Sequence, residues 1–397
     1  MEPDRDIATL ESSSRVRSSR SARREDFCAD PSPEAVLAEN LRQKKIPRLD
    51  ALRAISALIV VLFHFGVLAL PAGLGVMTFF VISGFLITWL LLIETERTGT
   101  VALGHFYFRR TFRIFPAFYV FWAVTVVGML VKHRSILWGQ AVATLFYVGN
   151  YYQGLNHYPE TGLSHAWSLG VEEQYYLLWP AVAMLLARRP RLLFQITCGA
   201  MLLVWVYRGV LVFRGMPQEY IYTAFDTRID HLLIGCAVAI ALRFGYLSAL
   251  WRIVCARAGY ALLTLAGLTV SSAAELVWRS DYRDTIGFIV NPVLIAFLLV
   301  QLLSSRSSWL KWMDSAPMIF LGAISYSTYL YHELAGDLAG MLVGNLPRVW
   351  AMVAIVAACY LAASASYFLV EKPFLRARAR IENRWIRHGI HVATPRD

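Results

Sequence analysis

Charged side chains are scarce in this chain. Asp, Glu, Lys and Arg make up 16% of its 397 residues, against about 25% in a typical soluble domain. Apolar runs of about 18–22 residues recur between Ala51 and Val370, long enough to cross a bilayer as helices. These runs lack the apolar–polar alternation of barrel strands. The sequence therefore predicts an all-α, polytopic membrane protein rather than a soluble one.

Cysteine is also rare. The five cysteines are scattered, with no CxxC spacing and no cluster with histidine. We therefore expect neither a disulfide framework nor a metal site. The net charge of +11 could suggest a nucleic-acid partner. In a membrane protein, however, Lys and Arg collect in cytoplasmic loops, so we expect the partner to be the lipid bilayer and not nucleic acid.

The N-terminal segment lacks the apolar stretch of a cleaved signal peptide. Its low hydrophobicity and its many Ser and Arg residues predict a disordered cytoplasmic tail over residues 1–45. The arginine run from Arg15 to Arg24 is suited to contact anionic lipid headgroups. We expect a transmembrane domain over 46–375 and a basic cytoplasmic C-terminal tail over 376–397.

About ten spanning helices are expected, with both termini cytoplasmic, because this count places most basic loops on one side of the membrane. The segment 136–152 would be an eleventh span and would invert every later loop. We therefore expect it to be an interfacial or re-entrant helix on the outer face. The expected spans are 51–70, 74–93, 114–131, 166–187, 192–212, 229–244, 258–274, 286–303, 317–338 and 349–370.

The stretch RAISALIVVLFH places Arg53 and His64 at the two ends of an apolar run. Eleven residues make about three helical turns, so both side chains share a face and stand about 16 Å apart along the axis. An ionisable residue inside the membrane is expensive and is a candidate functional residue by default. His64 is thus a candidate catalytic residue, although a histidine that only hydrogen-bonds neighbouring helices is the plain alternative.

A second basic pair lies in FRRTFRIFPAFYV. Arg110 and Arg113 are three residues apart and point the same way on a helix. Guanidinium groups suit phosphate, so with Arg53 at the same membrane face a phosphorylated cytoplasmic ligand is plausible. The alternative is a simple basic anchor beside a span.

The stretch HAWSLGVEEQYYLLWP contains His165 and Glu172, which are seven residues apart and share a helical face. A carboxylate near an imidazole is the pairing that orients a general base. A charge at a helix N-terminus and an interfacial aromatic belt that includes Trp167 are the alternative interpretation. We take Glu172 as a catalytic candidate, and His165 and Trp167 as substrate-binding candidates.

Three further polar positions lie in apolar surroundings. Ser83 lies in the middle of a span, where small-residue packing is the simpler explanation. Asp230 lies in FDTRIDHLLIG, where internal salt-bridging is the simpler explanation. His332 shares a span with several hydroxyls and either lines a polar cavity or is satisfied by neighbours. We take Ser83 as a donor-binding candidate, and Asp230 and His332 as substrate-binding candidates.

Seven motifs in this order resemble the membrane acyltransferase 3 family, the bacterial O-acyltransferases of sugars and antibiotics. The resemblance covers roughly residues 46–375. The basic residue and histidine separated by ten positions, followed by SGF and RxxR, are its most specific part. The motifs are RLDALRAISALIVVLFHF, FFVISGFLIT, FRRTFRIFPAFYV, HAWSLGVEEQYYLLWP, FDTRIDHLLIGCAVA, ISYSTYLYHE and YFLVEKP.

This resemblance implies a ten-helix fold in the inner (plasma) membrane and transfer of an acyl group, by default acetyl, from acyl-CoA to a carbohydrate hydroxyl. No tightly bound cofactor is expected. Arg53 and His64 match the family's basic–ten–His pair, Arg110 and Arg113 its RxxR pair, and Glu172 the glutamate of its WSLxVE stretch. His231 departs from the small residue usual after FDTRxD, which bears on the acceptor pocket.

The expected mechanism places the CoA phosphates on the arginines and the thioester near His64, which acts as general base. Glu172 would orient or balance the imidazolium, and Ser83 would contribute a hydrogen bond. A covalent acyl-enzyme route stays open. The acceptor also stays open among surface polysaccharide, lipid-linked oligosaccharide, a Nod-factor-like signal and a macrolide sugar.

Two further expectations concern the protein as a whole. Many relatives of the resembling family carry a soluble hydrolase-like domain after the last span, and we expect none in this chain. A partner or single-domain action is therefore expected. A transporter or flippase is the alternative function, but the two matching halves with broken helices that it predicts are not evident in the sequence.

Overall fold

The computed structural model describes residues 33–43, 46–67, 73–257, 259–342 and 346–387, and all regular elements in these ranges are helical. The expected disorder of residues 1–32 lies outside the described residues. The elements are α2 (Pro33–Arg42), α3 (Pro47–His64), α4 (Gly73–Thr98), α5 (Leu103–Val131), α6 (Trp138–Leu145), α7 (Gly149–Leu155), η1 (Ser164–Ala166), α8 (Trp167–Leu186), α9 (Pro190–Phe213), α10 (Gln218–Thr223), α11 (Phe225–Phe244), α12 (Ser248–Cys255), α13 (Tyr260–Tyr282), η2 (Arg283–Gly287), α14 (Phe288–Ser304), η3 (Ser308–Asp314), α15 (Ala316–Leu342), α16 (Arg348–Ser366), η4 (Tyr367–Glu371) and α17 (Lys372–Arg387).

Each of the ten expected spans overlaps at least one of these helices, although 51–70 runs past the end of α3 and its last three residues lie outside the described part of the chain. Five helical segments are long and apolar enough to cross a membrane: α4, α5, α9, the run Tyr260–Ser304 and the run Arg348–Trp385. A sixth is added if Gln218–Phe244 and Ser248–Cys255, bent by 103° to each other, count as one span. The chain is therefore an all-α membrane protein. The count of ten and the cytoplasmic termini stay predictions, which impermeant thiol labelling of cysteines placed in the loops would check.

The segment 136–152 does not form one spanning helix. It is divided into α6 and α7, and Tyr147 between them takes a left-handed backbone conformation with φ 57°. At 1.5 Å per residue these helices are about 12 and 10 Å long, far short of the roughly 30 Å hydrocarbon core. This agrees with the interfacial or re-entrant segment expected from the sequence.

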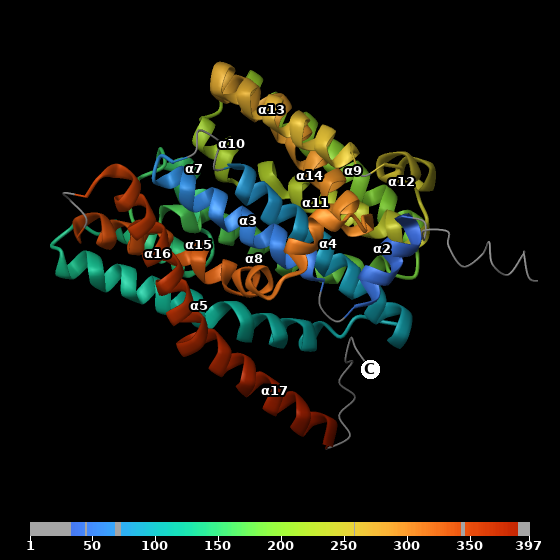
Figure 1. The fold of residues 1–397 in the computed structure, drawn as a ribbon, viewed down its shortest axis with the longest axis horizontal. Coiled ribbons are helices and arrows are strands. Elements are labelled where there is room, and N and C mark those ends of the chain that lie inside the picture. The colour runs from blue at the N-terminus through green and yellow to red at the C-terminus, as the bar shows by residue number, and fades with distance from the viewer. Residues whose placement is uncertain (1–32, 44–45, 68–72, 258, 343–345, 388–397) are drawn as a thin grey trace, which may run out of the picture.

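Helices α4 and α11 pack closely at the centre of the bundle, with α3 and α8 beside α4 (Figure 1). Glycine permits this approach. A Cβ atom added at Gly84 would lie 1.9 Å from the carbonyl oxygen of Leu232, and one added at Gly235 would lie 2.1 Å from that of Val81. The SGF motif in α4 therefore serves helix packing through its glycine, as the sequence suggested for small residues.

We expect Gly84→Ala to destabilise the protein by about 1–3 kcal/mol or more, because backbone rather than a flexible side chain blocks the added methyl group. The measurement is the midpoint of thermal unfolding in detergent. Gly199→Ala in α9 is the matched control, since its Cβ would meet no atom within 4 Å. An unfolding midpoint equal to that of the wild type in Gly84→Ala would contradict the observed helix contact.

Both expected tails contain ordered helix. The expectation of disorder through residue 45 is wrong for Pro33–Arg42, which forms α2. This helix buries Val36, Leu37 and Leu41, and Asn40 Nδ2 donates a hydrogen bond of 2.7 Å to the Leu303 carbonyl. The apolar positions of α2 therefore hold this helix against the rest of the bundle.

Most of the expected C-terminal tail also belongs to a helix. Residues 376–387 continue α17, which extends away from the other helices in Figure 1. It packs against α5 through Phe108 and Trp385, whose ring centroids are 4.6 Å apart, and through His105 Nε2 and Glu382 Oε1, 3.0 Å apart. The remaining residues, 388–397, lie outside the described part of the chain.

Candidate active site

Two cavities meet inside the bundle. The first, which we call the arginine cavity, has a volume of about 130 Å³ and is lined by Arg53, Arg110 and Arg113. The second, the histidine cavity, has a volume of about 390 Å³ and is lined by His64 and His165. Val76 of α4 and Tyr329 of α15 line both. The two cavities therefore share a wall.

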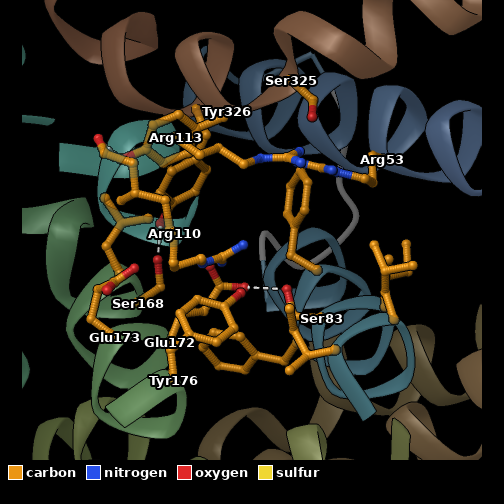
Figure 2. Close-up of a pocket in the computed structure, with 18 of the residues that line it drawn as sticks. Arg53, Ser83, Arg110, Arg113, Ser168, Glu172, Glu173, Tyr176, Ser325 and Tyr326 are labelled. Carbon is orange, nitrogen blue, oxygen red and sulfur yellow. Dashed lines mark hydrogen bonds between the residues drawn. The ribbon is translucent and has the colours of Figure 1, made fainter. Parts of the chain in front are cut away.

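Two helices bring the arginines of the arginine cavity together. Arg53 comes from α3, and Arg110 and Arg113, three residues apart, come from one face of α5. Figure 2 shows Arg53 and Arg113 extending toward each other. The Arg110 guanidinium carbon lies 3.5 Å from the centre of the Tyr176 ring. This concentration of guanidinium groups favours a ligand with phosphate or other oxyanion groups.

Carboxylates limit the positive charge of the arginine cavity. Glu172 and Glu173, in the second turn of α8, both line it. Ser83 of α4 donates a hydrogen bond of 2.7 Å to Glu172 Oε1 (Figure 2). Ser83 thus lies with the three arginines, as a donor-binding residue would. Glu172 lies there too, although it was expected beside His64, and it is not the carboxylate beside that histidine.

That carboxylate is Glu333, the last residue of the ISYSTYLYHE motif. Its Oε1 lies 3.8 Å from His64 Nε2, and its Oε2 lies 3.1 Å from His165 Nδ1. The fully buried His332 lies beside both histidines, with ring centroids 4.7 Å from His64 and 4.8 Å from His165. Three helical elements, α3, η1 and α15, therefore bring three imidazoles around one carboxylate.

Hydrogen bonds define the protonation of His64. Its Nδ1 lies 2.8 Å from the Val60 carbonyl oxygen, which can only accept, so Nδ1 carries the proton. The lone pair of the neutral ring is then on Nε2, which faces Glu333 and belongs to a side chain that lines the histidine cavity. This is the form of imidazole that can accept a proton.

His165 has acceptors on both sides. Its Nε2 lies 3.1 Å from the Leu330 carbonyl oxygen, and its Nδ1 faces the Glu333 carboxylate. His165 and Glu333 therefore face each other as a buried imidazole–carboxylate pair.

The rest of the histidine cavity is aromatic and polar. Trp167 and Tyr222 line it, with ring centroids 5.1 Å apart, and Tyr158, Glu160 and Arg283 add polar groups. Burial raises the pKa of the Tyr158 phenol well above its ordinary value, so this hydroxyl stays protonated and able to donate. Aromatic faces combined with a few polar groups suit a ligand with many hydroxyls.

Two of the expected substrate-binding residues lie outside both linings. Asp230 is fully buried between α9 and α11, where its Oδ2 accepts hydrogen bonds from Arg208 at 3.0 Å and from Trp205 at 2.9 Å. The geometry thus favours the internal salt bridge that was the simpler explanation. His332 contacts the other two histidines but lines neither cavity among the described residues.

Sequence reasoning did not select Glu333 or Tyr329. The signal for Glu333 was present: an acidic residue directly after His332 inside an apolar span. Tyr329 gave no such signal, because one tyrosine among several hydroxyls is ordinary. Its hydroxyl donates to the His165 carbonyl at 2.7 Å and lies 2.6 Å from Ser168 Oγ, which holds the shared wall in place.

A metal ion is a further chemical option for the cluster. His64, His332 and Glu333 each offer one ligand atom, and these atoms lie within 4.8 Å of one another. Zinc binds nitrogen and oxygen at about 2.0–2.2 Å, so the side chains would have to move closer to share an ion. The expectation from the sequence was no metal site, and the arrangement equally suits proton transfer.

Comparison with known proteins agrees with the motif order. The chain is 32% identical over 352 residues to the peptidoglycan O-acetyltransferase OatA of Listeria monocytogenes, a match that covers 83% of this chain and 56% of the relative. It is 29% identical over 359 residues to the O-acetyltransferase OatA of Staphylococcus aureus, covering 83% and 57%. The chain thus spans just over half the length of these relatives. No solved structure matches it.

The family assignment depends on the match over the transmembrane region. The acyltransferase domain family matches residues 46–367, which contain every residue of both cavities and of the histidine cluster. This match covers most of the chain and confirms the resemblance found in the sequence. The protein belongs to the membrane acyltransferase 3 family.

Proposed function

We propose that this protein is a multi-pass inner-membrane O-acetyltransferase that moves an acetyl group from acetyl-CoA to a hydroxyl of a carbohydrate. The main support for the proposal is the wall that the arginine and histidine cavities share. An arginine-lined cavity and a histidine-lined cavity meet at Val76 and Tyr329. A donor and an acceptor bound on the two sides of this wall would bring their reacting groups together without sharing one pocket.

The donor would occupy the arginine cavity. Acyl-CoA carries several phosphates and a long, unbranched pantetheine arm, and these features suit guanidinium groups and a narrow space of about 130 Å³. Arg53, Arg110 and Arg113 would hold phosphate oxygens, while Ser83 and Glu172 would hold polar groups of the arm. The thioester would then lie at the wall formed by Val76 and Tyr329.

The reaction would use His64 as general base. Its Nε2 takes the proton of the acceptor hydroxyl while the hydroxyl oxygen bonds to the acyl carbon. The carbon–sulfur bond then breaks, and the imidazolium returns its proton to the departing thiolate. Glu333, 3.8 Å from His64 Nε2, stabilises the imidazolium while it exists. In this scheme the carboxylate partner of His64 is Glu333, and Glu172 serves the donor side.

The acceptor would bind in the histidine cavity. Trp167 and Tyr222 offer aromatic faces for a sugar ring, and Tyr158 and Glu160 offer hydrogen bonds to its hydroxyls. Among the acceptors that the sequence left open, a peptidoglycan-type glycan is supported by the name of the Listeria relative. We therefore propose an N-acetylated cell-wall sugar as the acceptor class.

We expect Arg113→Ala to weaken acetyl-CoA binding about 10- to 100-fold, because each lost charge-assisted phosphate contact costs about 1.5–3 kcal/mol. Calorimetric titration of the purified protein in detergent would measure this, alongside transfer of labelled acetyl to peptidoglycan fragments. Arg188→Ala, which removes an exposed arginine bonded only to the Gly99 carbonyl in the described structure, is the control. Wild-type protein that binds no acetyl-CoA, or transfers no acetyl group, would refute the proposed activity.

A further inference from the structure

Helix α4 lines a third cavity, which we call the α2 cavity because residues of α2 cover it. Its volume is about 730 Å³, and its lining includes Leu37 and Arg42 of α2, Trp89 and Arg97 of α4, and Arg243 of α11. Leu86 and Leu90 of α4 line both this cavity and the arginine cavity. The two spaces are therefore neighbours, as the arginine and histidine cavities are.

One face of α4 connects all three spaces. Val76, Ser83, Leu90 and Arg97 are seven residues apart, so each lies two turns beyond the last on nearly the same face. Val76 lines both the histidine and the arginine cavity, and Ser83 lines the arginine cavity. Leu90 lines both the arginine and the α2 cavity, and Arg97 lines the α2 cavity. Twenty-one residues correspond to a path of about 31 Å. Such a path suits an elongated ligand with different chemistry at its two ends.

The chemistry of the α2 cavity is basic and aromatic. Arg42, Arg97 and Arg243 line it with a single carboxylate, Glu96, which is ion-paired with Arg243 through a 2.6 Å contact to Nε. The Arg243 guanidinium carbon lies 5.4 Å from the centre of the Trp89 ring. The indole N–H of Trp89 is buried and has no hydrogen-bond partner among the described residues. Arginines beside an aromatic ring with a free donor suit a phosphorylated heterocycle.

The α2 cavity is larger than the arginine cavity. A space of about 130 Å³ is below the usual range for small-molecule sites of roughly 300–1,000 Å³, whereas about 730 Å³ is within it. The arginine cavity is thus suited to a thin arm and the α2 cavity to a bulky head group. A ligand that needs both is one with a nucleotide at one end and an unbranched chain at the other.

We propose that the α2 cavity binds the phosphorylated nucleotide end of the acyl-CoA donor, with its 3′-phosphate near Arg42 and Arg97 and its base near Trp89. This inference rests on the proposed function, because it names where the remainder of the donor lies. An anionic lipid headgroup shares the phosphate chemistry. The continuity with the arginine cavity at Leu86 and Leu90 favours the nucleotide.

The test compares fragments of the donor. The full-length protein in detergent is titrated with CoA, with dephospho-CoA, which lacks the 3′-phosphate, and with 4′-phosphopantetheine, which lacks the nucleotide. We expect the double variant Arg42→Ala, Arg97→Ala to bind CoA at least 10-fold more weakly than the wild type. Its affinity for 4′-phosphopantetheine should be unchanged, and its preference for CoA over dephospho-CoA should disappear.

A second variant tests the space in the α2 cavity without removing a charge. Ile93 lines only the α2 cavity of the three and is half-buried. Ile93→Trp should fill space in the cavity and produce the same selective loss of CoA affinity. Arg252→Ala, an exposed arginine next to Trp251 that does not line the cavity, is the control and should bind CoA as the wild type does. Thermal unfolding identifies any variant that fails to fold.

The outcomes separate the two proposals. Wild-type protein that does not bind CoA would overturn the proposed function and this inference together. Wild-type protein that binds CoA, loses affinity on Arg113→Ala and keeps it in both α2-cavity variants would overturn this inference alone. Titration with nanodiscs of phosphatidylglycerol or phosphatidylcholine tests the other source of phosphate. If the wild type binds phosphatidylglycerol nanodiscs, and the α2-cavity variants lose this binding but keep their CoA affinity, then the cavity binds a lipid headgroup. That result would overturn the nucleotide site.

Discussion

His64→Gln is expected to lower kcat by about 10²–10⁴-fold while leaving acetyl-CoA affinity near that of the wild type, because a positioned general base contributes a factor of this size. Glutamine keeps a polar side chain of related size but cannot take a proton. The Nδ1 contact to the Val60 carbonyl shows that the lone pair of the neutral imidazole is on Nε2, on the side of Glu333. Single-turnover acetyl transfer and CoA titration on the same preparation measure the two quantities.

His133→Gln is the matched control for this variant, since His133 is exposed and lies outside both cavities. If folded His64→Gln turned over at a near wild-type rate, His64 would be a packing residue, and the role of base would pass to His332 or His165. Assay after chelation adds an independent check. Loss of activity that is restored by a divalent metal would indicate that His64, His332 and Glu333 bind an ion instead.

Glu333→Gln is expected to lower kcat by about 10²-fold and also to destabilise the protein. The carboxylate stabilises the imidazolium of His64 during the reaction, and an electrostatic partner of this kind is typically worth 10²–10³ in rate. It also pairs with the buried His165, 3.1 Å away. Removing the carboxylate leaves the buried His165 without the acceptor that faces it, which is costly.

A double variant separates these two effects. His165→Gln, Glu333→Gln removes both members of the buried pair, so its thermal unfolding midpoint should recover toward the wild type while kcat stays low. Asp337→Asn, an exposed carboxylate one turn further along α15, is the control and should change neither quantity. Recovery of both stability and rate in the double variant would mean that Glu333 has only a structural role.

The sequence predicted those features that depend on one helix at a time. The all-α class follows from the length of the apolar runs, and every expected span overlaps a helix. Arg110 and Arg113 line one cavity together because residues three apart on one helix share a face. Arg53 and His64 lie on one face of α3 for the same reason, although the structure places them in adjoining cavities.

Predictions from the sequence were wrong where the burial of a segment depends on its contacts with other helices. Residues 33–42 belong to the segment 1–45, whose low hydrophobicity and Ser and Arg content predict a disordered tail, yet α2 is held by apolar contacts and by a bond from Asn40 to Leu303, more than 250 residues away. Asp230 looked like a ligand-binding residue, yet Arg208 of α9 pairs with it in the protein interior. Contacts between residues this far apart in the chain leave no pattern in the neighbouring sequence from which they could be predicted.

By itself, the sequence determined the helices, the membrane setting and the identity of most candidate residues, because helical periodicity and hydropathy are properties of neighbouring residues. Only the tertiary structure decided which of these residues meet. It paired Glu172 with Ser83 and placed Glu333 between His64 and His165. It also joined three cavities along α4 through Val76, Leu86, Leu90 and Tyr329. The physical reason is that contacts between helices depend on packing angle and depth, and these are fixed by close approaches such as Gly84 against Leu232 rather than by spacing along the chain.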